Sequence, residues 1–293
     1  MFIATLIASD RLSAGDISEA CDRLLRAGLK VERSHWIDEG HAADIGFDGN
    51  PQSARKALER AFPITDVVVQ PAQGRRKMLL VADMDSTMIT VECIDELADY
   101  AGIKPQIAEV TERAMRGELD FADALDARVA LLKGLAESAI DRCLAERVTI
   151  MPGAELLVRT MRGWGATTIL VSGGFTRFAE PVADTIGFER VIANRLLIED
   201  GALTGKVEKP IVDSSTKQAT LEAAIGQRDI DDHLSLAVGD GANDLAMIRR
   251  AGLGVAYHAK PIVAQAAAAR IDHGDLSALL YAQGVPRRDW VVD

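Results

Sequence analysis

The sequence predicts an α/β protein with a Rossmann-like, doubly wound parallel sheet, an inserted helical cap and a small ferredoxin-like α+β domain in front. Three observations favour this fold class. The length of 293 residues suits about two domains. The first 75 residues are patterned β-α-β-β-α-β, and the remainder alternates short apolar runs with helical stretches. We therefore expect one unit at 1–75 and a second at 76–293.

The first unit opens with a short apolar run at 2–9, which we expect to be a strand. Apolar side chains then recur at helical spacing over 17–29, with Asp16 or Ser18 near the predicted start. Asn50 and Pro51 favour the N-cap and first position of a second helix. The remaining segments complete the pattern: strand-compatible stretches at 31–37 and 41–49, a closing strand at 64–70 and a linker at 71–77.

The second unit contains four apolar runs that fit the strands of a parallel sheet, namely 78–84, 167–174, 234–241 and 253–258. Between the first two lies a long segment, about 90–150, that is helical in pattern almost throughout. Four helices fit there, at 93–102, 107–119, 121–135 and 137–148. A crossover of that length exceeds what a βαβ connection requires, so it predicts a helical cap over the edge of the sheet.

The charge balance excludes some partners. With 33 basic and 44 acidic residues the net charge is −11, which disfavours nucleic acid and anionic membranes. No apolar run approaches the ~20 residues of a membrane span, and the apolar start lacks a basic region. Cys21, Cys93 and Cys143 are too widely spaced for a disulfide framework or a zinc site. We expect a cytoplasmic protein.

Polar clusters follow three of the apolar runs. They are 83–87 (DMDST), 172–174 (SGG) and 239–244 (GDGAND). Because the carboxyl ends of parallel strands meet at one edge of a sheet, the clusters should converge there. Each cluster alone would also fit an ordinary turn. Three of them in order, each at a strand end, favour a ligand site instead.

The chemistry of that site follows from its residue types. Asp83, Asp85, Asp240 and Asp244 would place four carboxylates in one small volume, which is unfavourable without a cation. Mg²⁺ prefers carboxylate oxygens, water and phosphate. Ser172 and the N–H groups of Gly173 and Gly174 would donate to phosphate oxygens. Lys217, in the polar stretch 213–220, would supply a fixed cation. These features together predict phosphoryl transfer.

The segments DMDST, VSGG, a downstream lysine and VGDGANDLAMI resemble the four motifs of the haloacid dehalogenase-like phosphatase superfamily. Within it, the chain resembles the phosphoserine phosphatases over about 77–280, including ECIDELA, MRGELDFADAL, RVALLK and MPGAELLV. The N-terminal unit is loosely similar to the ACT-type domains that some members carry. The resemblance implies a hydrolase of O-phospho-L-serine that acts in the last step of serine biosynthesis.

The resemblance also implies roles for individual residues. Asp83 would attack phosphorus and become an aspartyl phosphate, and Asp85 would act as the acid and base. Mg²⁺ would be held by the Asp83 carboxylate, the Asp85 backbone carbonyl and Asp240, with Asp244 behind them. The phosphoryl group would be held by Ser172, Gly173, Lys217 and Asn243. Register favours Lys217 over Lys206 and Lys209 as the motif lysine.

The cap should select the substrate, because phosphoserine carries a carboxylate and an ammonium on one carbon. Arg128 suits the carboxylate and Glu92 the ammonium. The resemblance places both residues there, with Met115 and Phe121 as apolar contacts.

Alternatives stay open: phosphothreonine, phosphohomoserine or another small phosphate ester as substrate, phosphotransferase activity, or a binding protein whose phosphatase core has lost activity. A homodimer is implied by the resemblance alone. An amino-acid ligand on residues 1–75 is a further alternative to simple packing of that unit.

Overall fold

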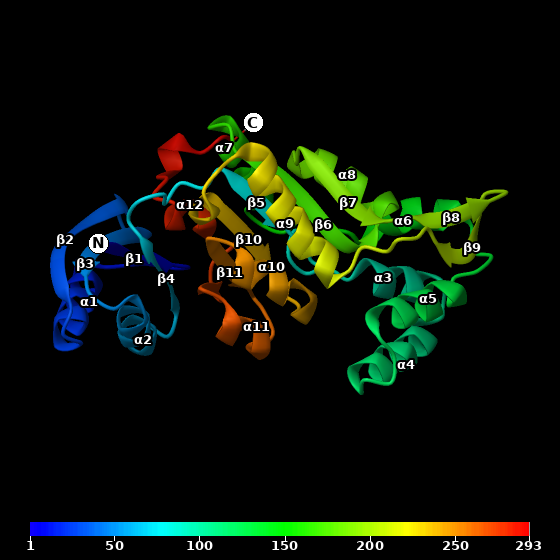
Figure 1. The fold of residues 1–293 in the computed structure, drawn as a ribbon, viewed down its shortest axis with the longest axis horizontal. Coiled ribbons are helices and arrows are strands. Elements are labelled where there is room, and N and C mark those ends of the chain that lie inside the picture. Colours follow the sequence, from blue (N-terminus) through cyan, green and yellow to red (C-terminus); the bar gives the residue numbers. More distant parts are fainter. Residues whose placement is uncertain (293) are drawn as a thin grey trace.

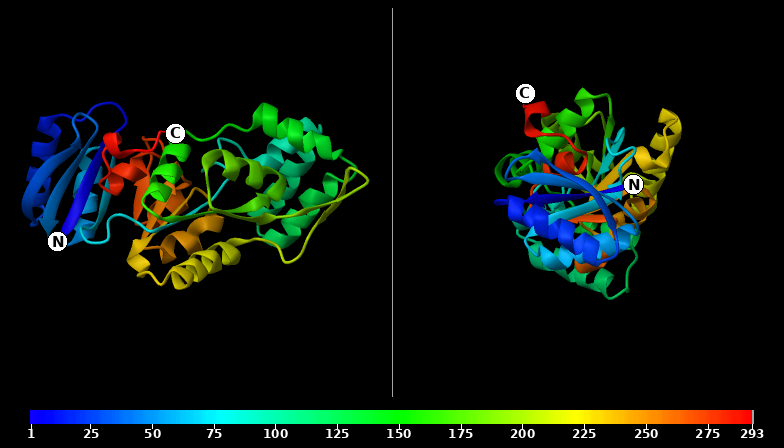
Figure 2. Two further views of the ribbon diagram at one scale, coloured as in Figure 1. Left: turned by 90° about the horizontal axis from the view of Figure 1, so that it is seen from above. Right: turned by 90° about the vertical axis from the view of Figure 1, so that its left-hand side faces the viewer.

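The computed structural model describes residues 1–292, without the side chain of Met115. Three parts lie in a row: a small N-terminal unit, a central sheet covered by helices, and a helical cap at the far end (Figure 1). The view from above shows the same order, with the cap furthest from the N-terminal unit (Figure 2). Among the described residues, no helix combines the length and the apolar character that crossing a bilayer requires.

The N-terminal unit has the predicted β-α-β-β-α-β order. Its elements are β1 (Phe2–Ala8), α1 (Ala14–Arg26), β2 (Lys30–Asp38), β3 (Ala42–Asp48), α2 (Pro51–Ala61) and β4 (Thr65–Pro71). The strands pair antiparallel in the order β2-β3-β1-β4, the ferredoxin-like arrangement. Leu6, Ile45 and Phe47 are fully buried between this sheet and its two helices. The small α+β domain of the predicted fold class is confirmed.

Both helices of this unit start near the residues predicted for them, and the structure adds the N-cap of the first. Asn50 caps α2 by accepting from the backbone N–H of Ser53 at 3.0 Å, and Pro51 is the first helical residue, as predicted. Asp16, one of the two residues expected near the start of α1, lies in its first turn, whereas the N-cap itself was not predicted. Ser13 is the N-cap and forms a capping box with Asp16, the third helical residue. The N–H of Ser13 donates to the Asp16 carboxylate, and the N–H of Asp16 donates to the Ser13 hydroxyl.

The central sheet is fully parallel and has six strands in the order β12-β11-β10-β5-β6-β7. Its strands are β5 (Leu79–Ala82), β6 (Thr167–Phe175), β7 (Arg190–Asn194), β10 (Ser235–Gly239), β11 (Leu253–Tyr257) and β12 (Ala269–Ile271). The chain runs outward in one direction from β5 to β7 and in the other from β10 to β12. The strand order therefore reverses between β5 and β10, the doubly wound pattern that the sequence predicted.

Helices cover both faces of this sheet, which explains why its central strands contain continuous apolar runs rather than alternating apolar and polar residues. Leu79 and Val81 of β5 pack against α9 (Ser214–Arg228) and α10 (Leu245–Arg250) on one face. Leu80 and Ala82 pack against α7 (Ala154–Gly163) and α8 (Thr176–Ile186) on the other. Figure 2 shows the two helical layers on either side of the strands. The other helical elements of the core are α11 (Pro261–Ala266), α12 (Ala278–Ala282), η1 (Asp232–Leu234), η2 (Ala242–Asp244) and η3 (Arg287–Asp289).

The cap consists of four helices between β5 and β6, as predicted: α3 (Cys93–Tyr100), α4 (Lys104–Met115), α5 (Phe121–Leu131) and α6 (Glu137–Arg147). A hairpin of β8 (Leu196–Glu199) and β9 (Ala202–Val207) joins it, which the sequence analysis did not predict. Leu203 exchanges backbone hydrogen bonds with the turn after α5: its N–H donates to Leu135 at 2.9 Å, and its carbonyl accepts from Gly134 at 2.8 Å. The edge strands β7 and β12 of the main sheet were also missed.

The segment at 72–78 joins the two units and is held by hydrogen bonds at two of its three basic residues. The Arg75 guanidinium binds the buried Asp44 carboxylate of β3 and donates to the carbonyls of Tyr281 and Ala282 at 3.0 and 2.8 Å. The buried Lys77 ammonium donates to the carbonyls of Gly74 and His233, at 3.0 and 2.8 Å. A second contact between the units comes from Asp66 of β4, which accepts from three backbone N–H groups in 272–274. The connection is therefore a packed joint.

Candidate active site

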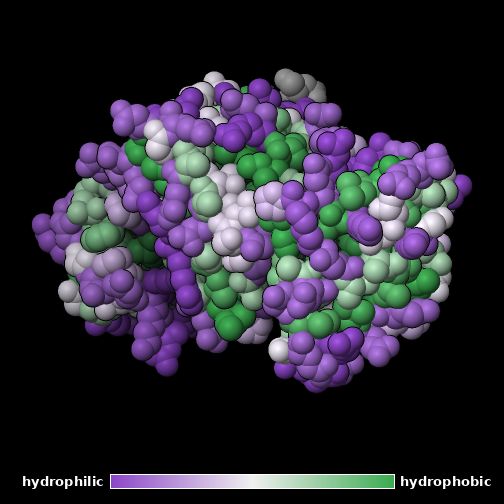
Figure 3. Space-filling model, turned by 45° about the vertical axis from the view of Figure 1, so that its right-hand side comes forward, coloured by the Kyte–Doolittle hydropathy of each residue, from purple (hydrophilic) through white to green (hydrophobic). Residues whose placement is uncertain are grey.

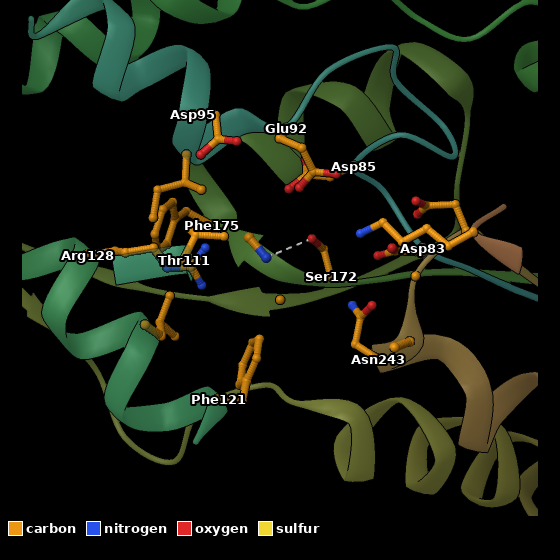
Figure 4. Close-up of a pocket in the computed structure, with 18 residues that line it drawn as sticks. Asp83, Asp85, Glu92, Asp95, Thr111, Phe121, Arg128, Ser172, Phe175 and Asn243 are labelled. Carbon is orange, nitrogen blue, oxygen red and sulfur yellow. Dashed lines mark hydrogen bonds between the residues drawn. The ribbon is translucent and has the colours of Figure 1, made fainter. Parts of the chain in front are cut away.

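The polar clusters meet at the carboxyl edge of β5, β6 and β10, in a cavity of about 390 Å³ between the core and the cap. Core residues form one wall and cap residues from α3 and α5 form the other, as Figure 4 shows for Asp83, Ser172 and Asn243 facing Arg128 and Phe121. A recess between core and cap is visible on the surface in Figure 3. The convergence expected from strand order is present in the structure.

A buried lysine joins two of the predicted carboxylates. The Lys217 ammonium, 1% exposed, lies 2.6 Å from an Asp83 oxygen and 2.7 Å from an Asp244 oxygen. Burial alone would lower the pKa of Lys217, but the charges of Asp83 and Asp244 outweigh it and raise the pKa, so the ammonium stays charged. The second Asp244 oxygen accepts the N–H of Gly241 at 3.0 Å.

Packing around Asp244 depends on a glycine. A Cβ on Gly239 would lie 2.5 Å from the Asp244 carboxyl carbon, so no larger residue fits at the end of β10. With one oxygen on Lys217 and the other on Gly241, the Asp244 carboxylate is fully engaged by the protein. Asp83 and Asp240, by contrast, line the cavity between core and cap, where a ligand can reach them.

The group formed by Asp83, Asp240, Asp244 and Lys217 has a net negative charge. Oxygen atoms of Asp83, Asp240 and Asp244 all lie within 4.8 Å of one another. Burial, together with the charges of Asp83 and Glu92, raises the pKa of Asp240 to about 6. Burial and Asp83 likewise raise the pKa of Asp244. Three carboxylates against one ammonium leave two negative charges, which a divalent cation would cancel, so the residues fit a hard metal ion such as Mg²⁺.

Asp85 is half-buried in the loop that follows β5, and its Oδ1 is shielded from solvent. Burial, and then the charges of Glu92 and Asp83, raise its pKa well above the usual range of an aspartate. Its Oδ1 has no hydrogen-bond partner among the described residues. The loop turns sharply at Ser86, whose φ of +55° is in the left-handed region, and the Ser86 hydroxyl donates to Glu92 at 2.7 Å. A carboxyl group of this kind can hold a proton at neutral pH.

The second polar cluster, Ser172-Gly173-Gly174, belongs to the strand β6 itself, which ends only at Phe175. Ser172 is 1% exposed, and its hydroxyl oxygen accepts the N–H of Gly174 at 2.8 Å, the dashed line in Figure 4. A Cβ on Gly174 would lie 3.0 Å from that oxygen, which explains the glycine. Asn194, buried at the end of β7, holds this segment through the Gly173 carbonyl at 2.8 Å and the backbone of Val212.

The cap supplies the charged residues that the sequence analysis selected. Glu92 is the N-cap residue of α3, and Arg128 lies on α5; both line the cavity. Burial lowers the pKa of Arg128, whereas the nearby carboxylates, Asp95 first, act against that shift. Phe121 at the start of α5 faces Gly173, where a Cβ would lie 3.1 Å from the ring. The expectation for Met115 concerns a side chain outside the described part of the structure.

Several lining residues were not selected from the sequence. Asp95 and Thr111 in the cap and Lys260 at the start of α11 border the cavity. Lys260 acts to lower the pKa of Asp240. The sequence signal that could have found Lys260 is the Ala-Lys-Pro segment at 259–261, which is part of the resemblance to the phosphoserine phosphatases. The other two candidate lysines lie elsewhere: Lys206 is exposed, and Lys209 pairs with Asp126 at 2.7 Å on the surface.

Comparison with known proteins agrees with this geometry. The family described as haloacid dehalogenase-like hydrolase matches residues 80–249. A protein of Streptomyces coelicolor named phosphoserine phosphatase is 42% identical over 285 residues, which are 95% of this chain and 69% of that protein. A solved structure titled as a probable phosphoserine phosphatase from Vibrio cholerae, unliganded form, is 33% identical, with a TM-score of 0.79 over 98% of this chain and 88% of that one.

A phosphoserine phosphatase of Mycobacterium tuberculosis is 46% identical over 213 residues. Those residues are 73% of this chain but only 52% of that relative, so the chain spans about half the length of one of its relatives. The motifs, the sheet order and these similarities all agree. The chain belongs to the haloacid dehalogenase-like hydrolases and, among them, to the phosphoserine phosphatase family.

Proposed function

We propose that the protein hydrolyses O-phospho-L-serine to L-serine and phosphate through an aspartyl phosphate on Asp83, with Mg²⁺ as cofactor. The observation that carries this proposal is the arrangement of the cavity. A carboxylate fixed by Lys217 lies on one wall, and Glu92 and Arg128, suited to an amino acid, lie on the other. The name shared by the relatives supports the same substrate class.

Asp83 is placed to act as the nucleophile. Its backbone N–H donates to the carbonyl of Val238 at 3.0 Å, which fixes it at the end of the sheet, and Lys217 holds one carboxylate oxygen. The other oxygen is then free to attack phosphorus. A bond forms between this oxygen and phosphorus while the bond from phosphorus to the serine oxygen breaks.

Asp85 supplies and removes the proton. Its raised pKa keeps the carboxyl group protonated until the serine oxygen leaves, and that oxygen takes the proton. The resulting carboxylate then accepts a proton from the water that attacks the phosphoaspartate. Phosphate departs, and Asp83 is restored as a carboxylate.

The metal would be held by Asp83, Asp240 and the backbone carbonyl of Asp85, with Asp244 behind them. Its chemistry is to neutralise charge on the phosphoryl oxygens and to lower the repulsion between phosphate and the carboxylates. Asp244 suits the outer position because both of its oxygens already have protein partners. We propose that Ser172, Gly173, Asn243 and Lys217 hold the phosphoryl group or the residues around it.

Recognition of the amino-acid part is assigned to the cap. The Arg128 guanidinium would bind the carboxylate in a forked arrangement and Glu92 the ammonium, with Phe121 against the carbon chain. Residues 1–75 are proposed as a regulatory or dimerisation domain and 76–293 as the catalytic unit, with cap helices at about 90–150.

The test is phosphate release from phosphoserine and from para-nitrophenyl phosphate, with and without Mg²⁺. Arg128→Met should lower kcat/KM for phosphoserine about 10- to 100-fold, because a charge-assisted hydrogen bond pair is lost. The rate with para-nitrophenyl phosphate, which has no carboxylate, should change little. Arg147→Met, an exposed cap arginine, is the matched control. An equal loss on both substrates, or a preference above ~100-fold for another ester, would contradict the substrate assignment.

A further inference from the structure

A second cavity lies where the N-terminal unit meets the core. Its volume is about 400 Å³, similar to that of the active-site cavity. The N-terminal unit contributes Phe2 and Val69 to its walls, and the core contributes Ile248, Leu253 and Ala267. Figure 3 shows a recess between the small lobe and the core, with hydrophobic residues at its base. The walls are suited to an aliphatic group.

The charged residues that border this cavity all carry positive charge. They are Arg55 of α2 and Arg249 of α10, and no carboxylate of residues 1–292 lines it. Arg55 is held in place: its Nε pairs with Glu59 at 2.7 Å, and one terminal nitrogen donates to the carbonyls of Ala267 and Ala268, both at 2.7 Å. Arg249 is exposed and has no ion-pair partner among residues 1–292.

A shallower hollow of about 380 Å³ adjoins the cavity and shares Arg55 with it. Its other charged residues are Lys56, Arg60 and Arg270 against a single carboxylate, Glu59. A concentration of cations at this point contrasts with the net charge of −11 of the whole chain. The mouth of the cavity therefore attracts anions that the rest of the surface repels.

Two short helices connect this cavity with the active site. The first turn of α10 follows Asn243 and Asp244, and its last turn carries Ile248 and Arg249 into the cavity wall. The helix α11 begins after Lys260, which lines the active site, and ends at Ala266 in the cavity. Each has six residues, so the two sites are about 9 Å apart along the helix axes. Each helix therefore has one end at the cavity and the other at the active site.

We propose that this interdomain cavity binds a small aliphatic carboxylate and that binding changes the properties of the active site through α10 and α11. The planar guanidinium groups favour a carboxylate, and the apolar walls favour a hydrocarbon body. The binding part of this inference does not depend on the proposed substrate.

Calorimetric titration of the full-length protein with hexanoate tests the binding. The titration is repeated on Arg128→Met, which removes the other arginine expected to take a carboxylate, and hexanoate should bind it as it binds the wild type. Arg249→Gln should weaken binding about tenfold or more, because a charge-assisted contact is lost. Arg26→Gln, an exposed arginine on α1, is the control and should have no effect. Absent binding, equal binding by hexan-1-ol, or an unchanged affinity of Arg249→Gln would overturn the site.

The coupling is read in two ways. Saturating hexanoate should change kcat/KM for para-nitrophenyl phosphate about fivefold or more in the wild type, and the change should be lost in Arg249→Gln. The affinity for Mg²⁺, measured by calorimetry without turnover, should shift in the same samples because Asp244 lies at the start of α10. If both quantities stay constant while hexanoate binds, the coupling is refuted. The Mg²⁺ titration keeps this result distinct from a failure of the proposed phosphatase activity.

Discussion

Replacing Lys217 by methionine tests the electrostatics of the active site most directly. The change keeps a side chain of similar length and removes the charge that lies 2.6 Å from Asp83 and 2.7 Å from Asp244. Asp244 is 0% exposed, so water cannot replace the lost partner. Removing one member of a buried ion pair costs about 3–5 kcal/mol, a large part of the roughly 5–15 kcal/mol by which a domain is stable.

The loss should depend on pH in a defined direction. Burial and Asp83 raise the pKa of Asp244 to about 7 even with Lys217 present. Without the ammonium that pKa rises further, so at pH 5 the carboxyl group of Asp244 is protonated and this residue carries no buried charge. At pH 8 the full cost applies. The free energy of unfolding in EDTA should therefore fall by several kcal/mol at pH 8 and by about 1–2 kcal/mol at pH 5, the value of the lost hydrogen bonds.

The assay is urea unfolding of the metal-free protein at both pH values, with kcat measured separately in Mg²⁺. Lys209→Met is the control because it removes an exposed lysine that pairs with Asp126. A loss in Lys217→Met no greater than in this control, or a loss equal at pH 5 and pH 8, would refute the account. Turnover should fall about 10²- to 10³-fold, as when one fixed donor to the transition state is removed.

Three further predictions concern the metal group, the nucleophile and the joint between the units. In EDTA, Asp240→Asn should stabilise the protein at pH 7.5 and not at pH 4.5. A carboxyl whose pKa is raised from 3.8 to about 6 costs stability as pH rises through that interval, by at most about 3 kcal/mol before solvent screening. Equal urea midpoints at pH 7.5 would contradict this. Asp83→Asn should abolish turnover with the circular dichroism spectrum retained, and rapid-quench labelling should trap an alkali-labile phosphoenzyme in the wild type only; a labelled Asp83→Asn protein would exclude this nucleophile. Arg75→Met should increase hydrogen exchange in 1–71, because Asp44 loses its buried partner, whereas the exposed Arg76→Met should not; equal exchange in both would argue against a packed joint.

The main features of the site were predictable because they depend on local patterns and one topological rule. DMDST, SGG and GDGAND each follow an apolar run, and parallel strands bring their carboxyl ends to a single edge. The charged pair in the cap was found only through a family resemblance, since nothing in the spacing of Glu92 and Arg128 shows that α3 and α5 face the sheet.

What was missed depends on contacts between distant segments. The β8–β9 hairpin is short, with strands of four and six residues, and it is stabilised where Leu203 pairs with Gly134 and Leu135 of the cap. The strand β12 has three residues and is defined only by its pairing with β11. The Asn194 side chain donates to the carbonyl of Gly173 and accepts the N–H of Val212. It thereby joins two segments that lie 21 residues before it and 18 residues after it in the sequence. No pattern of neighbouring residues encodes such pairings.

The core side and the cap side of the cavity differ in their charge, so they would differ in how each binds its end of the proposed substrate. Lys217 is buried and already paired with two carboxylates, so it has little charge left to attract a phosphate dianion. On the core side, the protein alone offers phosphate the N–H groups near Ser172 and the amide of Asn243, against the carboxylates of Asp83 and Asp240. On the cap side, Arg128 is half-buried and has no ion-pair partner among the described residues. Under the proposed function, the amino-acid end of the substrate would bind the cap without a metal, whereas the phosphate end would bind favourably only when a divalent cation has cancelled the excess negative charge.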